Sequence, residues 1–296
     1  MKKIHMKRRD FLKSSAAAAM VMSLGKRAFA DGGNYSTKLQ KALQYSMLPK
    51  NLSDEDKFKL ALDCGFEGIE VNPIEDLDHA KALGELSREI GTPIHSICFG
   101  GWDMPFSDPD PKVIQRGLEA ARTALRAANA LQADTVLLVP VVVNKKATVE
   151  QAWERSLKHI PELIPLADEM KVVIAIEEVW NGFLLDSASE FARYVDEFDS
   201  PWIQAYFDVG NVVKFGDPVE WIRTLGKRIN KIHLKDFRKK GEKWTNLRDG
   251  DVDWPAVRKA IDDIGYNGFL TTELGGGDEA YLRDLGERCD LIIAGK

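Results

Sequence analysis

Short apolar runs alternate with longer amphipathic segments along most of the chain. Runs typical of buried strands lie near residues 40–46, 67–72, 93–98, 134–140, 172–177, 203–208, 229–235 and 268–273. Helical patterns follow them near 53–64, 76–91, 111–132, 147–170, 187–199, 217–226, 253–265 and 279–294. Parallel β-α-β units produce this alternation, and eight such units close into a barrel. The pattern therefore predicts a single-domain α/β protein, a (β/α)8 TIM barrel.

Signals at the segment ends agree with this division. Ser53 precedes an acidic first turn, which is typical of a helix start. Gly65, Gly91 and Gly265 lie just past predicted helices, where a left-handed residue commonly ends a helix. A Rossmann sheet is the competing α/β architecture, but no G-x-G-x-x-G motif follows the first strand.

The last four predicted strands each end in a side chain that can bind a metal. They are Val172–Glu177, Ile203–Asp208, Ile229–His233 and Gly268–Glu273. A lone charge at the edge of an apolar core is costly to desolvate. Because the carboxyl ends of parallel strands meet at one end of a barrel, we expect Glu177, Asp208, His233 and Glu273 to converge. One imidazole and three carboxylates suit Mn²⁺, Mg²⁺ or Co²⁺, and Zn²⁺ is also compatible.

Two neighbouring glutamates compete for the ligand position of the fifth strand. Period-two alternation puts Ala175 and Glu177 on one face and Ile176 and Glu178 on the other. A small alanine suits the barrel interior, and a bulky isoleucine suits the face that meets the helices. The alternation favours Glu177 as the ligand, with Glu178 as the alternative.

Other polar and aromatic residues fall where a sugar could be bound. Loops after the third, fifth and seventh strands carry Trp102, Trp180 and Trp244, whose rings suit the C–H face of a sugar. A glycine run at 275–277 follows the eighth strand and could hold a phosphate or form a plain turn. The candidate substrate-binding residues are Glu70, His95, Asn211, Lys235 and Asp236. The alternatives are a buried core role for His95, pairing with a base for Glu70 and a salt bridge at the rim for Asp236.

The first thirty residues read as a targeting segment. Lys7–Lys13 contains a twin arginine, Ser14–Leu24 is mildly apolar, and Ala28–Ala30 has the small residues of a cleavage site. We therefore expect a twin-arginine signal peptide over 1–30, a barrel over 31–296 and a periplasmic location. The apolar run is too short for an uncleaved membrane span.

Charge excludes some classes of partner. Residues 1–30 contain eight of the 41 Lys/Arg and one of the 46 Asp/Glu, so the remainder has a net charge of −12. An acidic protein of this kind is not suited to nucleic acid or to an anionic membrane surface. Cys64, Cys98 and Cys289 are odd in number and have no CxxC spacing, which does not favour a disulfide framework, although one pair could form.

Four stretches resemble a known family. Ile176–Asn181, Tyr206–Asn211, Lys231–Asp236 and Gly250–Trp254 are similar to the sugar phosphate isomerases/epimerases of the xylose-isomerase-like (β/α)8 superfamily. The resemblance implies a divalent metal on Glu177, Asp208, His233 and Glu273, with Glu177 and Glu273 also moving protons on opposite faces of the substrate. Related ketose 3-epimerases have a histidine where this chain has Asn211, and an arginine for which Arg238 is a loose candidate.

These observations lead to an expected activity. We expect a divalent-metal-dependent sugar isomerase or epimerase that acts on a ketose or keto-sugar through a metal-bound cis-enediolate. Export favours an unphosphorylated sugar, because sugar phosphates are mainly cytoplasmic metabolites. The alternatives are a metal-dependent lyase or dehydratase of keto-inositols or 3-keto-glycosides, and a non-catalytic periplasmic sugar-binding protein. The expected partner is a small-molecule sugar, with no nucleic acid and no membrane span in the mature chain; a homo-oligomer is compatible with the sequence.

Overall fold

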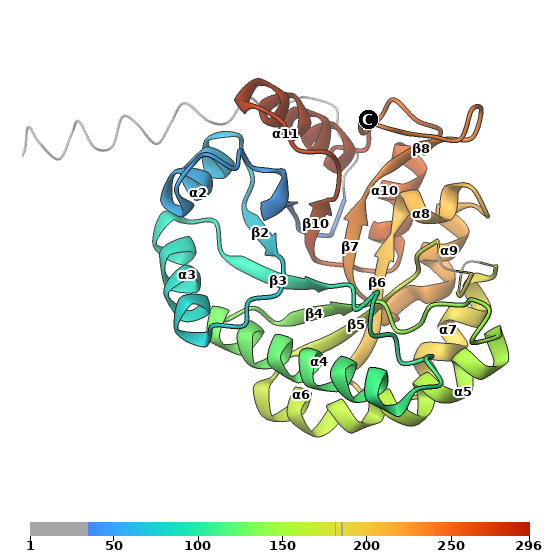
Figure 1. The fold of residues 1–296 in the computed structure, drawn as a ribbon. Helices are drawn as coiled ribbons and strands as arrows, with labels where there is room; N and C mark the ends of the chain where they lie inside the picture. Colours follow the sequence, from blue (N-terminus) through green and yellow to red (C-terminus); the bar gives the residue numbers. More distant parts are fainter. Residues whose placement is uncertain (1–34, 181, 185) are drawn as a thin grey trace, which may run out of the picture. The chain divides into compact units, whose positions relative to one another are not determined.

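Eight parallel strands form a closed barrel, surrounded by helices (Figure 1). The computed structural model describes residues 35–180, 182–184 and 186–296, so the predicted signal peptide at 1–30 lies outside the described residues. Around the ring the strand order is β1-β10-β7-β6-β5-β4-β3-β2. The predicted (β/α)8 fold is confirmed. The strands are β1 Leu39–Gln44, β2 Gly68–Val71, β3 Ile94–Phe99, β4 Thr135–Leu138, β5 Val173–Glu177, β6 Ile203–Asp208, β7 Ile229–Leu234 and β10 Gly268–Thr272.

The helices follow the strands as the sequence predicts, with one break. The segment predicted as one helix over 147–170 is divided into α5, a short 3₁₀ turn and α6. Pro161 and Pro165 cause the division, because each lacks a backbone N–H and starts a new helical turn. The α-helices are α2 Asp54–Asp63, α3 Leu77–Ile90, α4 Pro111–Leu131, α5 Val149–His159, α6 Ile164–Met170, α7 Ala188–Asp196, α8 Val209–Val213, α9 Pro218–Leu225, α10 Trp254–Asp263 and α11 Glu279–Ile293. The 3₁₀ turns are η1 Tyr45–Met47, η2 Ile160–Leu163 and η3 Gly226–Arg228.

Side-chain caps set the helix starts. Ser53 accepts a hydrogen bond from the backbone N–H of Asp56, as expected for the first helix. Thr148 and Gln151 form a capping box at α5. Gly91 ends α3 with a φ of 101°, a left-handed conformation that glycine adopts without strain. These caps fix where each helix begins and therefore how long each loop at the barrel rim is.

The strands bury different side chains on their two faces. Ile174 and Ile176 belong to the large apolar layer between strands and helices, whereas Ala175 packs with Tyr206 in a smaller cluster of five buried residues. The alternation predicted for the fifth strand is therefore confirmed. The barrel also buries polar groups, such as Lys231, whose Nζ lies 2.8 Å from Asp134 Oδ1.

Two elements were not predicted. An antiparallel hairpin, β8 Asp236–Arg238 paired with β9 Lys243–Thr245, follows β7. The helix α8 follows β6 directly. Both are too short to show a hydrophobic period. In the described part of the chain the three cysteines are free, and no helix combines the length and apolarity needed to span a membrane.

Candidate active site and metal centre

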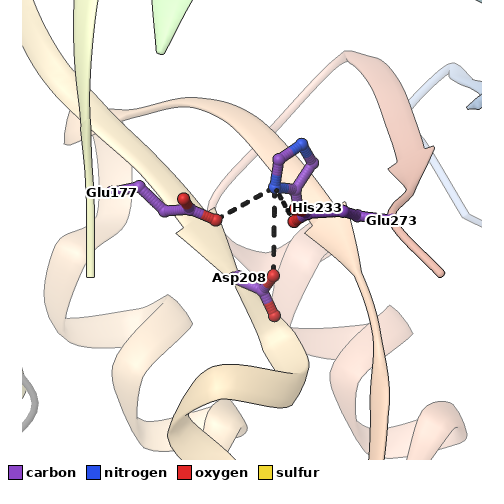
Figure 2. Close-up of side chains that lie close together, drawn as sticks. All are labelled: Glu177, Asp208, His233 and Glu273. Atoms are coloured by element: carbon purple, nitrogen blue, oxygen red, sulfur yellow. Dashed lines mark hydrogen bonds and ion pairs between the residues drawn. The ribbon is translucent and has the colours of Figure 1, made fainter. Parts of the chain in front are cut away.

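Four ionisable side chains meet at the carboxyl ends of β5, β6, β7 and β10 (Figure 2). One ligand atom from each of Glu177, Asp208, His233 and Glu273 lies within 4.8 Å of all the others. His233 Nδ1 lies 3.0 Å from Glu177 Oε1, 3.0 Å from Glu273 Oε2 and 3.9 Å from Asp208 Oδ2. The structure thus brings together the four residues that the strand ends predict.

The two glutamates of the fifth strand take different positions. Glu177 reaches the cluster, whereas Glu178 Oε1 accepts a hydrogen bond of 2.7 Å from the backbone N–H of Asp208. Glu178 is fully buried, and burial together with the nearby charges of Asp208 and Glu177 raises its pKa well above the usual range. Glu178 therefore links β5 to β6 outside the ligand cluster.

A carboxylate beneath His233 fixes the orientation of the imidazole. His233 Nε2 lies 2.8 Å from Glu70 Oε2, and Glu70 Oε1 accepts hydrogen bonds of 2.7 Å from both Ser96 and Tyr206. Burial alone would raise the pKa of Glu70, but the charge of His233 and its hydrogen bond lower it to about 2. With Nε2 held by Glu70, Nδ1 of His233 faces the three carboxylates of the cluster.

Burial and close-lying charges shift the pKa values of the site residues. Burial raises the pKa of Glu177, and the negative charge of Glu273 adds to the effect. Burial also raises the pKa of Glu273, but His233 and Lys235 outweigh it and hold that pKa well below its usual range. For His233 burial lowers the pKa, yet Tyr206 and the surrounding carboxylates raise it well above 6.5. The carboxylate cluster therefore strongly attracts positive charge.

The donor set fits a divalent metal. Asp208 Oδ1 accepts hydrogen bonds from the backbone N–H groups of Gly210 and Asn211, at 2.8 and 2.9 Å. Asp208 Oδ2 and Glu273 Oε2 are buried and accept no well-formed hydrogen bond from any described residue, although Lys235 Nζ lies 3.0 and 2.6 Å away. Buried carboxylate oxygens that lack a well-formed hydrogen bond and lie beside an imidazole nitrogen can serve as ligands for a hard or borderline cation.

A cavity of about 290 Å³ opens onto the cluster. Glu177, Glu273, Asn211 and Lys235 form its polar wall. The rest of its lining is largely apolar and includes Trp102, Trp180 and Trp244, which are 52%, 39% and 42% exposed. The rings of Trp180 and Trp244 lie 5.1 Å apart, centre to centre. A lining that combines polar groups with exposed aromatic rings is suited to one sugar ring.

Two of the predicted substrate-binding residues line this cavity. Asn211 donates from Nδ2 to the backbone carbonyl of Glu178, at 2.8 Å, and the backbone carbonyl of Asn211 accepts from Trp180 Nε1, also at 2.8 Å. The ammonium group of Lys235 forms ion pairs with the carboxylates of Asp208 and Glu273. Gly210 allows the close packing between these residues, because a Cβ there would lie 2.5 Å from the Lys235 Cβ. Asn211 thus holds Trp180, and Lys235 supplies positive charge at the ligand cluster.

Glu70 and Asp236 lie behind the cavity wall. Glu70 supports His233 from below and is 1% exposed. Asp236 turns into the loop after the hairpin, where its carboxylate accepts from Trp254 Nε1 at 3.0 Å. Three backbone N–H groups of that loop also donate to Asp236, at 2.8, 3.1 and 3.3 Å, from Arg248, Gly250 and Val252. Asp236 therefore organises the loop of residues 246–254.

His95 lies in the barrel interior. Its ring stacks on Phe269, with ring centres 4.3 Å apart, and Nε2 lies 3.1 Å from Thr271 Oγ1. Burial lowers the pKa of His95 to about 3, and the positive charge of Lys231 acts in the same direction. This is the core position that the sequence left open as the alternative for His95.

Sequence reasoning missed the residues that support Glu70. Tyr206 and Ser96 both donate to this carboxylate. Strand alternation could have found Tyr206, since it precedes Asp208 by two positions and shares its face. No comparable pattern singles out Ser96.

The chain belongs to a known family. Residues 58–287 match the family described as Xylose isomerase-like TIM barrel, and residues 5–25 match the TAT (twin-arginine translocation) pathway signal sequence. The resemblance noted in the sequence is confirmed, and the N-terminal match indicates twin-arginine export.

Curated relatives and solved structures agree with this family. SgbU of Escherichia coli K12, provisionally named an L-ribulose-5-phosphate 3-epimerase, is 29% identical over 245 residues, 77% of this chain and 85% of SgbU. The L-ribulose-5-phosphate 3-epimerase UlaE of Escherichia coli O1:K1 is 25% identical over 232 residues, 74% of this chain and 81% of UlaE. These relatives support an isomerase-class enzyme.

Two solved structures share the fold. D-psicose 3-epimerase of Clostridium cellulolyticum H10 superposes with a TM-score of 0.73 at 18% identity, covering 86% of this chain and 98% of the other. The 3-keto-D-glucoside 4-epimerase YcjR of Escherichia coli gives a TM-score of 0.72 at 15% identity, with the same coverage.

Proposed function

We propose that this protein is a divalent-metal-dependent isomerase or epimerase of an unphosphorylated ketose or keto-sugar in the periplasm. The observation that carries the proposal is the convergence of Glu177, Asp208, His233 and Glu273, three carboxylates and an imidazole that attract positive charge, as the ion pairs of Lys235 with Asp208 and Glu273 show. The match to a twin-arginine signal sequence supports the location and, through it, a free sugar. The names of the curated relatives support the reaction class.

The four residues would hold Mn²⁺, Mg²⁺ or Co²⁺, with Zn²⁺ also compatible. When bound, such an ion supplies Lewis acidity, which makes the C–H group beside a sugar carbonyl easier to deprotonate. Glu70 orients His233 for this role through the 2.8 Å contact with Nε2.

Two glutamates are placed to move the proton. Glu177 comes from β5 and Glu273 from β10, with β6 and β7 between them in the ring, so both carboxylates line the cavity from different sides. We propose that one removes the proton on the carbon beside the carbonyl, and that the other returns a proton to the opposite face. Return to the same carbon gives the epimer. Return to the adjacent carbon, with the proton of the neighbouring hydroxyl passing to the former carbonyl oxygen, gives the isomer.

The remaining cavity residues would bind the sugar. The Lys235 ammonium group would stabilise negative charge that develops on a substrate oxygen. Asn211 would hold Trp180 in place, and the tryptophan rings would pack on the C–H face of the sugar. Glu70, Asp236 and His95 would act through their neighbours, because none of them lines the cavity.

Proton exchange in heavy water tests the proposal. The Mn²⁺-loaded protein is incubated with D-fructose, D-tagatose, D-psicose and 3-keto-glucosides, and deuterium incorporation and product mass are measured. Glu273→Gln should abolish exchange while sugar binding survives, and the exposed control Glu287→Gln on α11 should leave exchange unchanged. Exchange that persists in Glu273→Gln would remove Glu273 from proton transfer. Products that have lost water would indicate the lyase reaction, and binding without exchange a sugar-binding protein.

A further inference from the structure

A second, larger cavity adjoins the one above the ligand cluster. Its volume is about 720 Å³, and we call it the side cavity. It lies between the β8–β9 hairpin with its following loop, the segment after β10 and the start of α11. The loop is held against α11, since Arg288 Nη1 donates to Leu247 O at 2.6 Å and to Asp249 Oδ1 at 2.9 Å. The side cavity is therefore bounded by segments that are fixed to one another.

The two cavities share one lining residue and are bordered by consecutive residues of the chain. Trp244 lines both. Glu273 lines the cavity above the cluster, and the next residues along the chain, Leu274 and Gly275, line the side cavity. A molecule that reached past Trp244 would enter the side cavity while one end stayed at the ligand cluster.

The lining of the side cavity has the chemistry of a carbohydrate site. Trp244 and Tyr281 offer aromatic faces, and Asn246 offers an amide. Aromatic side chains together with a few polar groups that fix orientation are typical of small-molecule sites.

Phosphate suits the side cavity less well than a sugar does. Asp249 lines it, and its carboxylate already pairs with Arg288 at 2.9 Å, so that cation is not free to hold an anion. Arg238, one of its two cationic residues, already donates to the backbone carbonyl of Asp249. The volume lies within the range of about 300–1,000 Å³ for pockets that bury whole small molecules, which is far more than one phosphate group needs.

We propose that the side cavity binds a second sugar unit, so that the substrate is a glycoside whose keto-bearing ring lies at the ligand cluster. The placement of the reacting ring rests on the proposed function. Whether the second ring occupies the side cavity does not depend on catalysis, so affinity measurements alone can test it.

The test uses two probes that differ only in the second ring, methyl 3-keto-β-D-glucoside and 3-keto-cellobiose. Binding to the Mn²⁺-loaded protein is measured by calorimetry, and deuterium exchange by mass spectrometry. Gly275→Phe fills the side cavity, because a Cβ at 275 meets no atom within 4 Å. Tyr281→Leu removes one aromatic face of the side cavity.

We expect 3-keto-cellobiose to bind at least ten-fold more tightly than the one-ring probe. Gly275→Phe should reduce that ratio at least ten-fold, and Tyr281→Leu should reduce it several-fold. Equal affinity for the two probes, a ratio unchanged in Gly275→Phe, or no binding of either probe would overturn the inference. Binding preference without proton exchange would leave the second-ring site standing and count against the proposed catalysis. Proton exchange with equal affinity for the two probes would support the proposed catalysis and overturn the second-ring site.

Discussion

Both ring nitrogens of His233 are committed to specific neighbours. Nε2 contacts Glu70 at 2.8 Å, and Nδ1 faces Glu177, Asp208 and Glu273. A carboxylate behind a metal-binding histidine fixes the ring orientation and raises its basicity. The strength of the proposed metal binding should therefore depend on Glu70, which is not itself in the ligand cluster.

Glu70→Gln should weaken Mn²⁺ binding by about 10- to 100-fold, because a neutral amide holds the imidazole less firmly than a carboxylate. Titration calorimetry with Mn²⁺ measures the change. Glu85→Gln, an exposed residue of α3, is the matched control and should bind Mn²⁺ like the unaltered protein. Equal affinity in Glu70→Gln would show that Glu70 does not support the site.

His95 should make stability depend on pH. Its pKa is about 3 in the folded chain and about 6.5 when exposed, so the unfolded state takes up the proton first as pH falls. The stability contribution is complete above pH 6.5 and is lost between about pH 6.5 and pH 3. At pH 5 the loss is about 2 kcal/mol.

Urea unfolding at several pH values measures this effect. His95→Gln removes the titrating group and should show a shallower decline of unfolding free energy below pH 6.5. The exposed His79→Gln should keep the full decline. If His95→Gln keeps it as well, the histidine is not buried in its neutral form.

At this scale the sequence predicts the ligands but not their supports. The four ligands are visible because each ends an apolar run, which is a local pattern. Glu70 and His233 are 163 positions apart, and their contact follows from barrel closure, which no local pattern encodes. The same reason explains why His95 could not be assigned to the core: stacking on Phe269 requires β3 and β10 to be placed in space.

Among the elements, the loop of residues 246–254 depends on one carboxylate. Asp236, at the start of β8, accepts from three backbone N–H groups of this loop and from the indole of Trp254. Gly250 is required there, because a Cβ would overlap the Asp236 carboxylate. The loop borders the side cavity, so its order should affect the sugar binding proposed there.

Asp236→Ala should lower the free energy of unfolding by about 2–3 kcal/mol, because buried hydrogen bonds to a charged acceptor are lost. Hydrogen exchange should quicken in residues 246–254 before the rest of the barrel. Asp263→Ala, at the exposed end of α10, should change neither quantity by a comparable amount. Uniform protection in the Asp236 variant would contradict this role for the carboxylate.

Element by element, periodicity predicts the long segments and misses the short ones. All eight barrel strands are recovered because each is a short segment in which apolar residues alternate with polar ones or follow one another. The strands β8 and β9 have three residues each and contain charged side chains, so no alternation could be recognised. Pro161 and Pro165 mark the division between α5 and α6. The prediction of one helix followed the helical period of the apolar residues and gave these prolines too little weight.

For the whole molecule, metal binding and stability should be linked. The proposed ion would join β5, β6, β7 and β10, and an ion that binds the folded state alone stabilises it by about 2.7 kcal/mol at a hundred times Kd. For a chain of this size the melting temperature should rise by about 5–10 °C. Differential scanning calorimetry with Mn²⁺ and with EDTA measures the shift. Asp208→Asn should show a much smaller one.

The proposed function depends on one divalent ion shared by Glu177, Asp208, His233 and Glu273. Anomalous diffraction at the manganese absorption edge, from crystals grown with Mn²⁺, tests this directly. One strong peak within bonding distance of all four side chains is the predicted result. A map without such a peak, or a peak held by other residues, would contradict the metal site and with it the proposed catalysis.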